Sequence, residues 1–232
     1  MGRPWRRLLG LAGVILASRL HAQDSRPGFA VFPFENGGSY GQDKEIFRAL
    51  ELGIPATLSA ALAAHPGATA ADPGRVRLAA SSQGLVPGHP VDAATASQIA
   101  KVTGARYAVT GSFADFYGKF RINARLVDAQ SGQIVKVVSN DDPALQARAR
   151  LAAIIQSVSG KLAATTGLPP FSADATARAG AIPTEALNQF SLGLLWESQG
   201  DRTKAAEAFR RALAAYPDYV QAREALQRVK AG

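Results

Sequence analysis

A glycine-rich loop after the first apolar run is the first place where the sequence could do chemistry. In FAVFPFENGGSYG the apolar residues 29–34 lead into three glycines within residues 37–41. A phosphate-binding loop needs free backbone N–H groups and usually a lysine that reaches the phosphates. Neither the G-x-G-x-x-G nor the Walker pattern occurs here, and Lys44 follows Asp43 rather than a glycine. We therefore expect no nucleotide or other cofactor, and interpret the stretch as a buried strand and its exit loop.

The other residue types that carry catalysis or bind metals do not fall into a recognisable arrangement. The chain has three histidines, none at metal-ligand spacing, and His65 and His89 each stand beside a proline. The acidic pair Asp141-Asp142 precedes Pro143, which favours a solvated turn that leads into a helix. No G-x-S-x-G motif surrounds a serine. We therefore expect no catalytic and no metal-binding residues, and a protein that is not an enzyme.

One group of charged residues stands out by its spacing. Lys119, Arg121 and Arg125 alternate with apolar residues between positions 119 and 127. A period of two predicts a strand with one basic, solvated face and one buried face. Basic strand faces with aromatic neighbours bind nucleic acids or acidic surfaces. Because the N-terminus resembles an export signal, we take a protein partner as the functional interpretation, and a merely solvated face as the alternative.

The first 22 residues have the pattern of a secretory signal peptide. Three arginines within residues 3–7 precede the ten-residue apolar run Leu8–Ala17, and Ala22 is a possible cleavage position. The run is too short to span a bilayer comfortably. We therefore predict a signal peptide over residues 1–22, with an uncleaved N-terminal anchor as the alternative. The mature protein is then expected in the periplasm, with peripheral membrane association at most.

The composition of the chain is that of an ordinary globular protein. The sequence has 232 residues, 47% of them hydrophobic, enough for one domain of ordinary size plus a smaller unit. Four of the 26 basic residues that produce the net charge of +8 lie in the acid-free first 22 residues, so the remainder is only mildly basic. The absence of cysteine excludes disulfides, thiol catalysis and a lipid-acceptor cysteine. We expect no nucleic-acid partner.

Strands and helices alternate up to about residue 165. Strands are predicted at residues 29–34, 75–80, 107–116, 119–127 and 133–139, and helices at residues 44–52, 54–64, 93–102 and 144–164. Pro55 is expected in the first turn of the second helix, where its missing N–H costs nothing. Asp92 is the expected N-cap of the third helix, and Gly104 its C-terminal glycine. Residues 28–165 are therefore expected to form an α/β domain.

The pattern changes after this domain. Residues 166–183 are rich in Thr, Pro, Gly and Ala and show little sustained period, which predicts a linker. Residues 184–232 show only helical periodicity. A second, small all-α unit is therefore expected at the C-terminus.

The all-α unit resembles a tetratricopeptide repeat. In EALNQFSLGLLWESQGDRTKAAEAFRRALAAYPDY the pattern residues of such a repeat recur across 34 positions; they are Leu192, Gly193, Trp196, Gly200, Ala205, Phe209, Ala212 and Pro217. The position that often carries tryptophan is Gln189. The resemblance implies a protein-docking groove, for which Gln189, Trp196 and Phe209 are the candidates. Because one repeat cannot bury its own apolar face, the alternative is a helical appendage that leans on the first domain.

The first domain resembles the TolB N-terminal and CsgG-like family over about residues 28–165. The pieces that carry the resemblance are, in order, VFPFEN, LGIPATLSAALAAHPG, IAKVTGARYAVTGSF and RINARLVDAQSGQIV. The resemblance implies a mixed sheet with packed helices, in the periplasm or at its membranes, and envelope proteins as partners. It carries no catalytic motif. The chain has no cysteine for the lipid anchor of CsgG, and repeat helices stand where TolB has its β-propeller.

Together these observations predict a non-enzymatic, exported envelope protein that acts as an interaction or assembly scaffold. The candidate protein-binding residues are Lys119, Arg121, Arg125, Gln189, Trp196 and Phe209. A second possibility is a homo-oligomeric accessory of a curli-type secretion channel in the outer membrane. A third is a small-molecule or nucleotide binder that uses the loop at residues 36–41.

Overall fold

The computed structural model of the chain describes residues 26–39, 43–86 and 88–231, so the predicted signal peptide lies outside the described residues. The strands are β1 (Gly28–Val31), β2 (Glu35–Asn36), β3 (Thr69–Ala70), β4 (Tyr107–Phe116), β5 (Lys119–Asp128) and β6 (Ile134–Ser139). The α-helices are α1 (Lys44–Ala63), α2 (Pro73–Ser81), α3 (Ala93–Val102), α4 (Leu151–Thr165), α5 (Ala173–Gly180), α6 (Thr184–Ser198), α7 (Arg202–Ala215) and α8 (Val220–Ala231). Two 3-10 helices, Pro143–Leu145 and Arg148–Arg150, precede α4.

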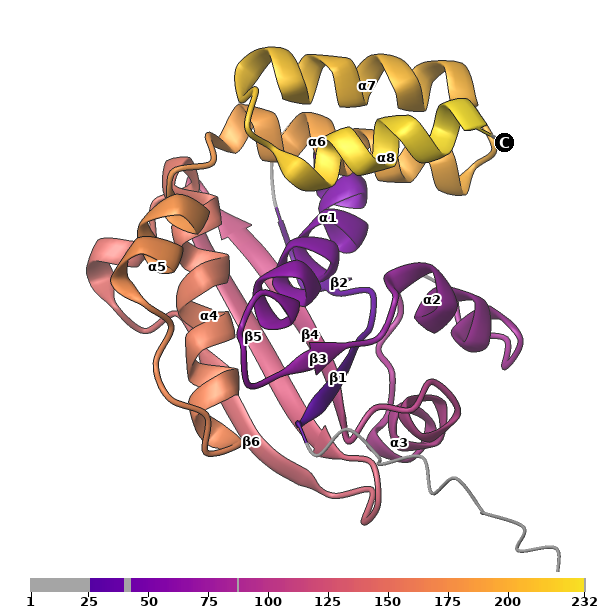
Figure 1. The fold of residues 1–232 in the computed structure, drawn as a ribbon, viewed down its shortest axis with the longest axis vertical. Helices are drawn as coiled ribbons and strands as arrows, with labels where there is room; N and C mark the ends of the chain where they lie inside the picture. Colours follow the sequence, from indigo (N-terminus) through magenta and orange to yellow (C-terminus); the bar gives the residue numbers. More distant parts are fainter. Residues whose placement is uncertain (1–25, 40–42, 87, 232) are drawn as a thin grey trace, which may run out of the picture.

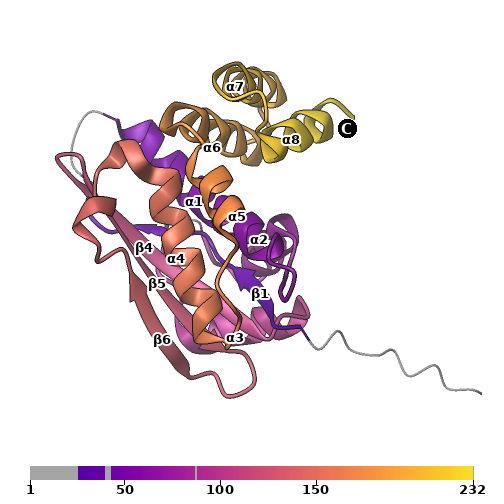
Figure 2. The same cartoon turned by 60° about the vertical axis from the view of Figure 1, so that its left-hand side comes forward.

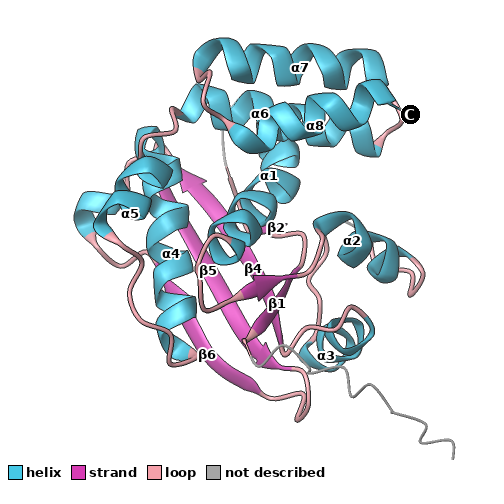
Figure 3. Cartoon of the chain, viewed as in Figure 1, coloured by secondary structure: helices cyan, strands magenta, loops and turns pink. Residues whose placement is uncertain are grey.

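The strands form one mixed sheet, as expected. Its order is β3-β1-β4-β5-β6, with β2 pairing with β4 beyond the end of β1. β1 runs parallel to both β3 and β4, whereas β4, β5 and β6 form an antiparallel meander (Figure 3). The predicted hairpin of residues 107–127 is therefore confirmed, and β6 forms an edge of the sheet. Helices packed on a mixed sheet make this an α/β fold.

One face of the sheet is covered by α1 and α4 (Figures 1 and 2). The alternation predicted for β5 is present, and Phe120, Ile122 and Leu126 are fully buried. They share one buried cluster with Ile54 of α1 and Ile155 of α4. Strand residues of period two and helix residues of period 3.6 thus present their apolar side chains to the same layer.

Among the residues that the structure describes, helices cover the opposite face of the sheet only at one end. There α2 and α3 contribute Val76 and Ile99 to a second buried cluster, together with Ala108 of β4 and Val127 of β5. Farther along β5, alternate residues from Lys119 onward are exposed or half-buried. We call this uncovered part of β4, β5 and β6 the open face of the sheet.

α1 is one helix of 20 residues where the sequence predicts two shorter ones. Proline lacks the N–H that bonds the carbonyl four residues earlier, so Pro55 should leave the Glu51 carbonyl unpaired. That carbonyl accepts a hydrogen bond from the backbone N–H of Phe34 at 3.0 Å. The segment after β1 therefore satisfies the group that Pro55 leaves free, and the helix continues. By length and composition α1 could cross a membrane, but ten of its residues are buried in this fold.

The predicted strand at residues 29–34 is interrupted. β1 ends at Val31, and a second short pairing with β4 begins at Glu35 as β2. Pro33 lies between them and has no N–H to donate to a sheet ladder. The aromatic run is thus buried as expected, but only its first half is a regular strand.

A helix also replaces a predicted strand. Residues 75–80 belong to α2, whose N-cap Asp72 accepts a hydrogen bond from the Arg75 backbone N–H at 2.8 Å. The prediction was wrong because it ignored this capping signal, which outweighs a short apolar run. The cap predicted for α3 is confirmed, since the Asp92 carboxylate accepts from the Thr95 N–H at 2.9 Å.

The predicted linker, residues 166–183, contains the helix α5. Ser172 caps α5 by accepting a hydrogen bond from the backbone N–H three residues later, and α5 packs on α4. Ahead of it, the Pro169 carbonyl lies 3.0 Å from Nε2 of the buried His65. The Nδ1 of His65 accepts from the Gly67 N–H at 3.0 Å, so Nε2 carries the proton and donates it to Pro169. This segment is therefore an ordered part of the fold.

The C-terminal helices pack on each other and on α1. Between α6 and α7, a Cβ added to Gly193 would stand 2.3 Å from the Phe209 ring. Between α6 and α1, a Cβ added to Gly53 would stand 1.8 Å from Ser191 Oγ. Glycine at both positions lets three helices approach more closely than any side chain would allow. Figure 1 shows the end of α1 reaching the layer of α6, α7 and α8.

Candidate functional site

β5 places Lys119, Arg121 and Arg125 on the open face of the sheet, as the alternation predicts. In the antiparallel register, Arg121 lies opposite Ala114 of β4, and Arg125 opposite Val137 of β6. The uncovered side of β5 is therefore basic between residues 119 and 125. We call Lys119, Arg121 and Arg125 the basic strand face.

The three basic groups differ in how far they are neutralised. The Arg121 guanidinium lies 3.4 Å from the Asp141 carboxylate, and both side chains are exposed. A hydrogen bond from the Ser139 hydroxyl holds the pKa of the Asp141 carboxyl below its usual value, so this acid stays charged. Lys119 and Arg125 have no ion pair or side-chain hydrogen bond with any residue that the structure describes. Two cations of the basic strand face are therefore available to a partner.

Two exposed aromatic residues stand at the end of the same hairpin. Phe116 is 48% exposed and Tyr117 is 95% exposed, and we call this pair the hairpin tip. Tyr117 and Gly118 both have positive φ, 53° and 85°, which is the geometry of a tight two-residue turn. Asp115 fixes the turn by accepting from the Gly118 N–H at 2.7 Å, and lies 3.3 Å from Arg148. The sequence indicated the turn but not that its aromatic residue would be presented to solvent.

The edge strand β6 carries a third exposed feature. Ile134, Val135 and Val137 are 46–55% exposed, although all three are β-branched apolar residues. β6 pairs only with β5 among the described strands. Its outer edge therefore offers unpaired backbone groups beside apolar side chains, which is the arrangement that accepts an added strand.

The three residues predicted to line a groove on the helical unit do not form an open surface. Phe209 is fully buried between α6 and α7, so it is a core residue. Trp196 is half-buried, and the Lys204 ammonium lies 4.5 Å from its ring centroid. Gln189 donates a hydrogen bond to Glu185 on its own helix at 2.8 Å. The structure brings Trp196 and Phe209 into one cluster, but as packing and not as a groove.

The other residues of the repeat resemblance also have packing or turn positions. Ala205 and Ala212 are fully buried, and Leu192 is half-buried. Gly200 has a φ of 81° in the turn between α6 and α7. Pro217 follows the end of α7. The spacing therefore predicted the helix hairpin correctly, including the close approach of the helices at Gly193.

The described part of the glycine-rich loop has its backbone donors occupied. The Asn36 side-chain oxygen accepts from the Ser39 N–H at 2.9 Å, and the Gly37 N–H donates to the Phe113 carbonyl at 2.8 Å. Gly41 lies outside the described residues. Within the described ranges, no group of three His, Asp or Glu side chains is placed to hold a metal ion.

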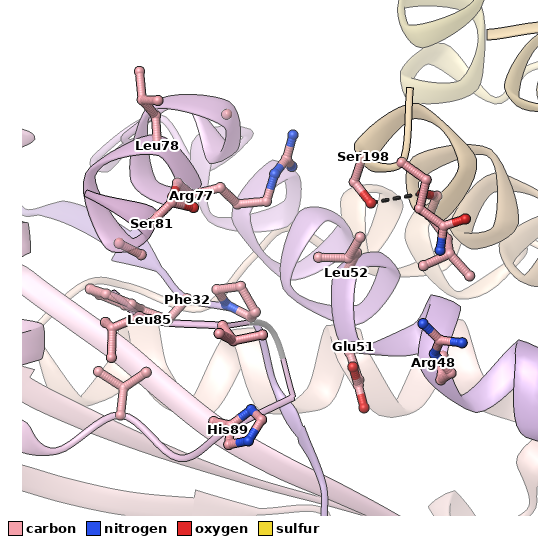
Figure 4. A pocket seen from close by; sticks show the side chains of 17 residues that line it. Phe32, Arg48, Glu51, Leu52, Arg77, Leu78, Ser81, Leu85, His89 and Ser198 are labelled. Carbon is pink, nitrogen blue, oxygen red and sulfur yellow. Dashed lines mark hydrogen bonds between the residues drawn. The ribbon is translucent and has the colours of Figure 1, made fainter. Parts of the chain in front are cut away.

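A pocket that sequence reasoning did not anticipate lies where α1, α2 and α6 meet (Figure 4). Its volume is about 600 Å³. Phe32, Leu52 and Leu195 supply buried apolar wall, and Arg77 and Glu51 supply polar groups. These residues come from segments far apart in the chain, so no local motif could have indicated the pocket.

No protein-family model matches the sequence, and no curated protein is significantly similar to it. Among solved structures, Escherichia coli LpoB is similar with a TM-score of 0.42 and 20% identity, over 50% of this chain and 56% of LpoB. Lipoprotein GNA1162 from Neisseria meningitidis gives 0.37 and 17%, over 59% of this chain and 96% of that one. TolB from Acinetobacter baumannii gives 0.34 and 18%, over 73% and 31%. The chain thus spans little more than half of LpoB, and similarity at this level assigns neither a family nor an activity.

Proposed function

We propose that the chain is a non-enzymatic protein, exported to the bacterial envelope, that assembles with other proteins through the open face of its sheet. The observation that carries the proposal is the combination of Lys119 and Arg125, which lack partners among the described residues, with the exposed hairpin tip. The signal-like residues 1–22 support export. The resemblance to TolB N-terminal and CsgG-like domains supports the periplasm, with peripheral association at the outer membrane.

The composition of this surface fits a protein partner with an acidic, partly apolar face. Aromatic residues and arginine dominate the binding energy of protein interfaces, because they bury much surface and pair with charges. Lys119 and Arg125 would guide an acidic partner to the sheet, while Phe116 and Tyr117 would supply apolar contact. A phosphate-bearing or nucleic-acid ligand is not favoured, because Asp141 already offsets one of the three cations.

The helical unit has a different part in this proposal. It resembles a tetratricopeptide repeat, but the side of α6 that holds Ser191 packs on Gly53 of α1. We infer that the unit braces α1, and through α1 the sheet, instead of capturing a separate peptide in a groove. The scaffold then has one principal docking surface, on the basic strand face and the hairpin tip.

Charge reversal tests the proposal. The full-length protein and its K119E/R125E variant are expressed in the native cells with an affinity tag, and co-purified envelope proteins are quantified. The matched control is R210E/K230E, which reverses two exposed cations of the helical unit. We expect at least one specific partner to be lost with K119E/R125E and retained with R210E/K230E. Equal recovery with both variants, or loss only with R210E/K230E, would contradict the proposal.

The exposed β6 edge favours a second candidate, a homo-oligomeric accessory of a secretion channel. Strand addition between two copies would pair the free edges and cover Ile134 and Val135. Light scattering on the purified protein should then show a species larger than a monomer that Val135→Lys dissociates. Val220→Lys, at a position 51% exposed on α8, is the control and should leave the assembly intact. A strict monomer at high concentration would rule this candidate out.

A further inference from the structure

The pocket between α1, α2 and α6 contains an arginine that the fold does not neutralise. Arg77 is half-buried, and its guanidinium has no ion pair or hydrogen bond with the described residues. Two carboxylates lie near enough to act on it electrostatically, those of Glu197 and Asp72. Glu197 is engaged by Arg228 through two contacts of 2.8 Å, and Asp72 caps α2. Both acids therefore have other partners, and the Arg77 side chain lines the pocket where it extends from α2 toward α6 (Figure 4).

The partial burial of Arg77 disfavours its charge, and an anion bound in the pocket would offset this effect. Burial lowers the pKa of the Arg77 guanidinium, which shows that its surroundings disfavour the charge. A guanidinium nevertheless remains protonated at every physiological pH. A carboxylate entering the pocket would accept two parallel hydrogen bonds from it, the geometry for which arginine is suited.

An acidic side chain lines the same pocket. Glu51 is half-buried on α1, and its carboxylate makes no hydrogen bond or ion pair with the described residues. Burial raises the pKa of the Glu51 carboxyl, against the opposing charges of Arg48 and His89. Its backbone is held in place, because its own carbonyl accepts the hydrogen bond from the Phe34 N–H at 3.0 Å. The pocket is thus lined by one carboxylate, that of Glu51, and by two guanidinium groups, those of Arg48 and Arg77, none of which makes an ion pair with the described residues.

The rest of the wall is apolar. Phe32, Leu52 and Leu195 are at most 7% exposed. At the rim, Leu78 is 73% exposed and Val86 is 60% exposed, although both are large apolar side chains. A volume of about 600 Å³ lies within the range of small-molecule sites, which are mostly apolar with a few polar groups. The pocket has this composition.

We propose that this pocket binds a short apolar peptide-like ligand, with its carboxylate on Arg77, an amide or ammonium donor on Glu51, and its side chains against Leu52 and Leu195. A fatty acid shares the carboxylate and the apolar body, but it has no donor for Glu51. The presence of both charged groups therefore favours the peptide-like ligand. This site lies apart from the basic strand face and does not depend on the proposed docking function.

Calorimetry on the full-length protein tests the inference with trileucine as the probe. We expect saturable binding of trileucine, weakened about tenfold or more when its carboxylate is amidated, since a charged hydrogen bond is lost. Arg77→Met should remove binding. Arg75→Met, on the exposed side of the same helix, is the matched control and should bind as the unchanged protein does. Glu51→Gln should weaken the binding of trileucine and leave unchanged any binding of laurate, which serves as the fatty-acid probe.

Several outcomes would overturn the inference. Trileucine binding that is absent, or that is equal in Arg77→Met and Arg75→Met, would exclude the pocket as its site. Laurate that binds more tightly than trileucine, with no effect of Glu51→Gln, would overturn the peptide-like ligand in favour of a fatty acid. K119E/R125E should bind trileucine normally, so a failure of the docking proposal and a failure of this one remain distinguishable.

Discussion

The C-terminal helical unit and the open face of the sheet were both candidate docking surfaces on sequence grounds, and they differ in what the fold leaves free. In the helical unit, Phe209 is fully buried, and Gly53 and Ser191 join α6 to α1 without space for another side chain. On the sheet, none of the described helices covers Lys119 and Arg125, and Tyr117 is 95% exposed. The first surface stabilises the molecule, and the second is available to a partner.

The difference shows that a repeat pattern reports helix packing, not which surface remains open. Small residues at fixed spacing allow helices to approach, and any helix with a matching small residue can be the neighbour. Here the neighbour is α1, where Gly53 supplies that small residue. Alternating charge on a strand is more direct evidence of exposure, because an unpaired cation is seldom buried.

The largest expected effect is a loss of stability on substitution of Phe209, which the helical unit buries completely. Phe209→Ala should lower the free energy of unfolding by about 3–5 kcal/mol, because it removes a fully buried ring and leaves a cavity. Trp196→Ala should cost clearly less, since Trp196 is half-buried. Chemical denaturation of both variants measures this. A Phe209→Ala variant as stable as the unchanged protein would mean that the ring is not core.

A smaller loss is expected when a methyl group is forced between α1 and α6. Gly53→Ala should lower the free energy of unfolding by about 1–3 kcal/mol, because the new Cβ would meet both Ser191 Oγ and Cβ. The control is Gly160→Ala in α4, where the nearest atom stands 3.9 Å away. That substitution should stabilise the protein by about 0.4–1 kcal/mol, as alanine favours a helix. Losses of equal size at both positions would contradict the close α1–α6 packing.

The smallest effect concerns Glu51, on α1, the helix against which the helical unit packs. Burial raises the pKa of this carboxyl above its ordinary 4.5, so the unfolded chain releases the proton at a lower pH than the folded one. The stability of the unchanged protein should therefore fall as the pH rises from about 4.5 through the folded pKa. Glu51→Gln removes this dependence and should gain stability relative to the unchanged protein between pH 4 and pH 7. A stability difference that stays constant across this range, or reverses sign, would show that Glu51 is not desolvated.

Local signals predicted much of the fold. The alternation along residues 119–127 predicted β5 and its buried face, and Asp92 with Gly104 predicted both ends of α3. The continuity of α1 through Pro55 was not predictable, because the bond that rescues it comes from Phe34. Some predictions failed where a distant backbone group decided the local conformation, as at Pro55, and others where a local signal was ignored, as with the Asp72 cap of α2.

The two candidate sites also differ in whether the sequence could predict them. The basic strand face was predictable from the sequence because its residues belong to one strand, whose period fixes which side chains share a face. The pocket was not, because Glu51, Arg77 and Leu195 meet only after three helices have packed. Even the lack of partners for Arg77 depends on the Glu197–Arg228 pair, which joins α6 to α8. Residues that meet only through tertiary packing show no regular spacing in the sequence, so no motif indicates the site.

Site-specific photocrosslinking in the native envelope tests directly whether the open face of the sheet is the docking surface. A photoreactive phenylalanine replaces Tyr117 at the hairpin tip in one variant, and Arg210 on the outer side of α7 in the other. Both positions are exposed, so the probe reports which surface meets a partner. We expect a discrete adduct from position 117 that K119E/R125E abolishes, and none from position 210. An adduct from position 210 alone would show that the helical unit, and not the open face of the sheet, is the docking surface.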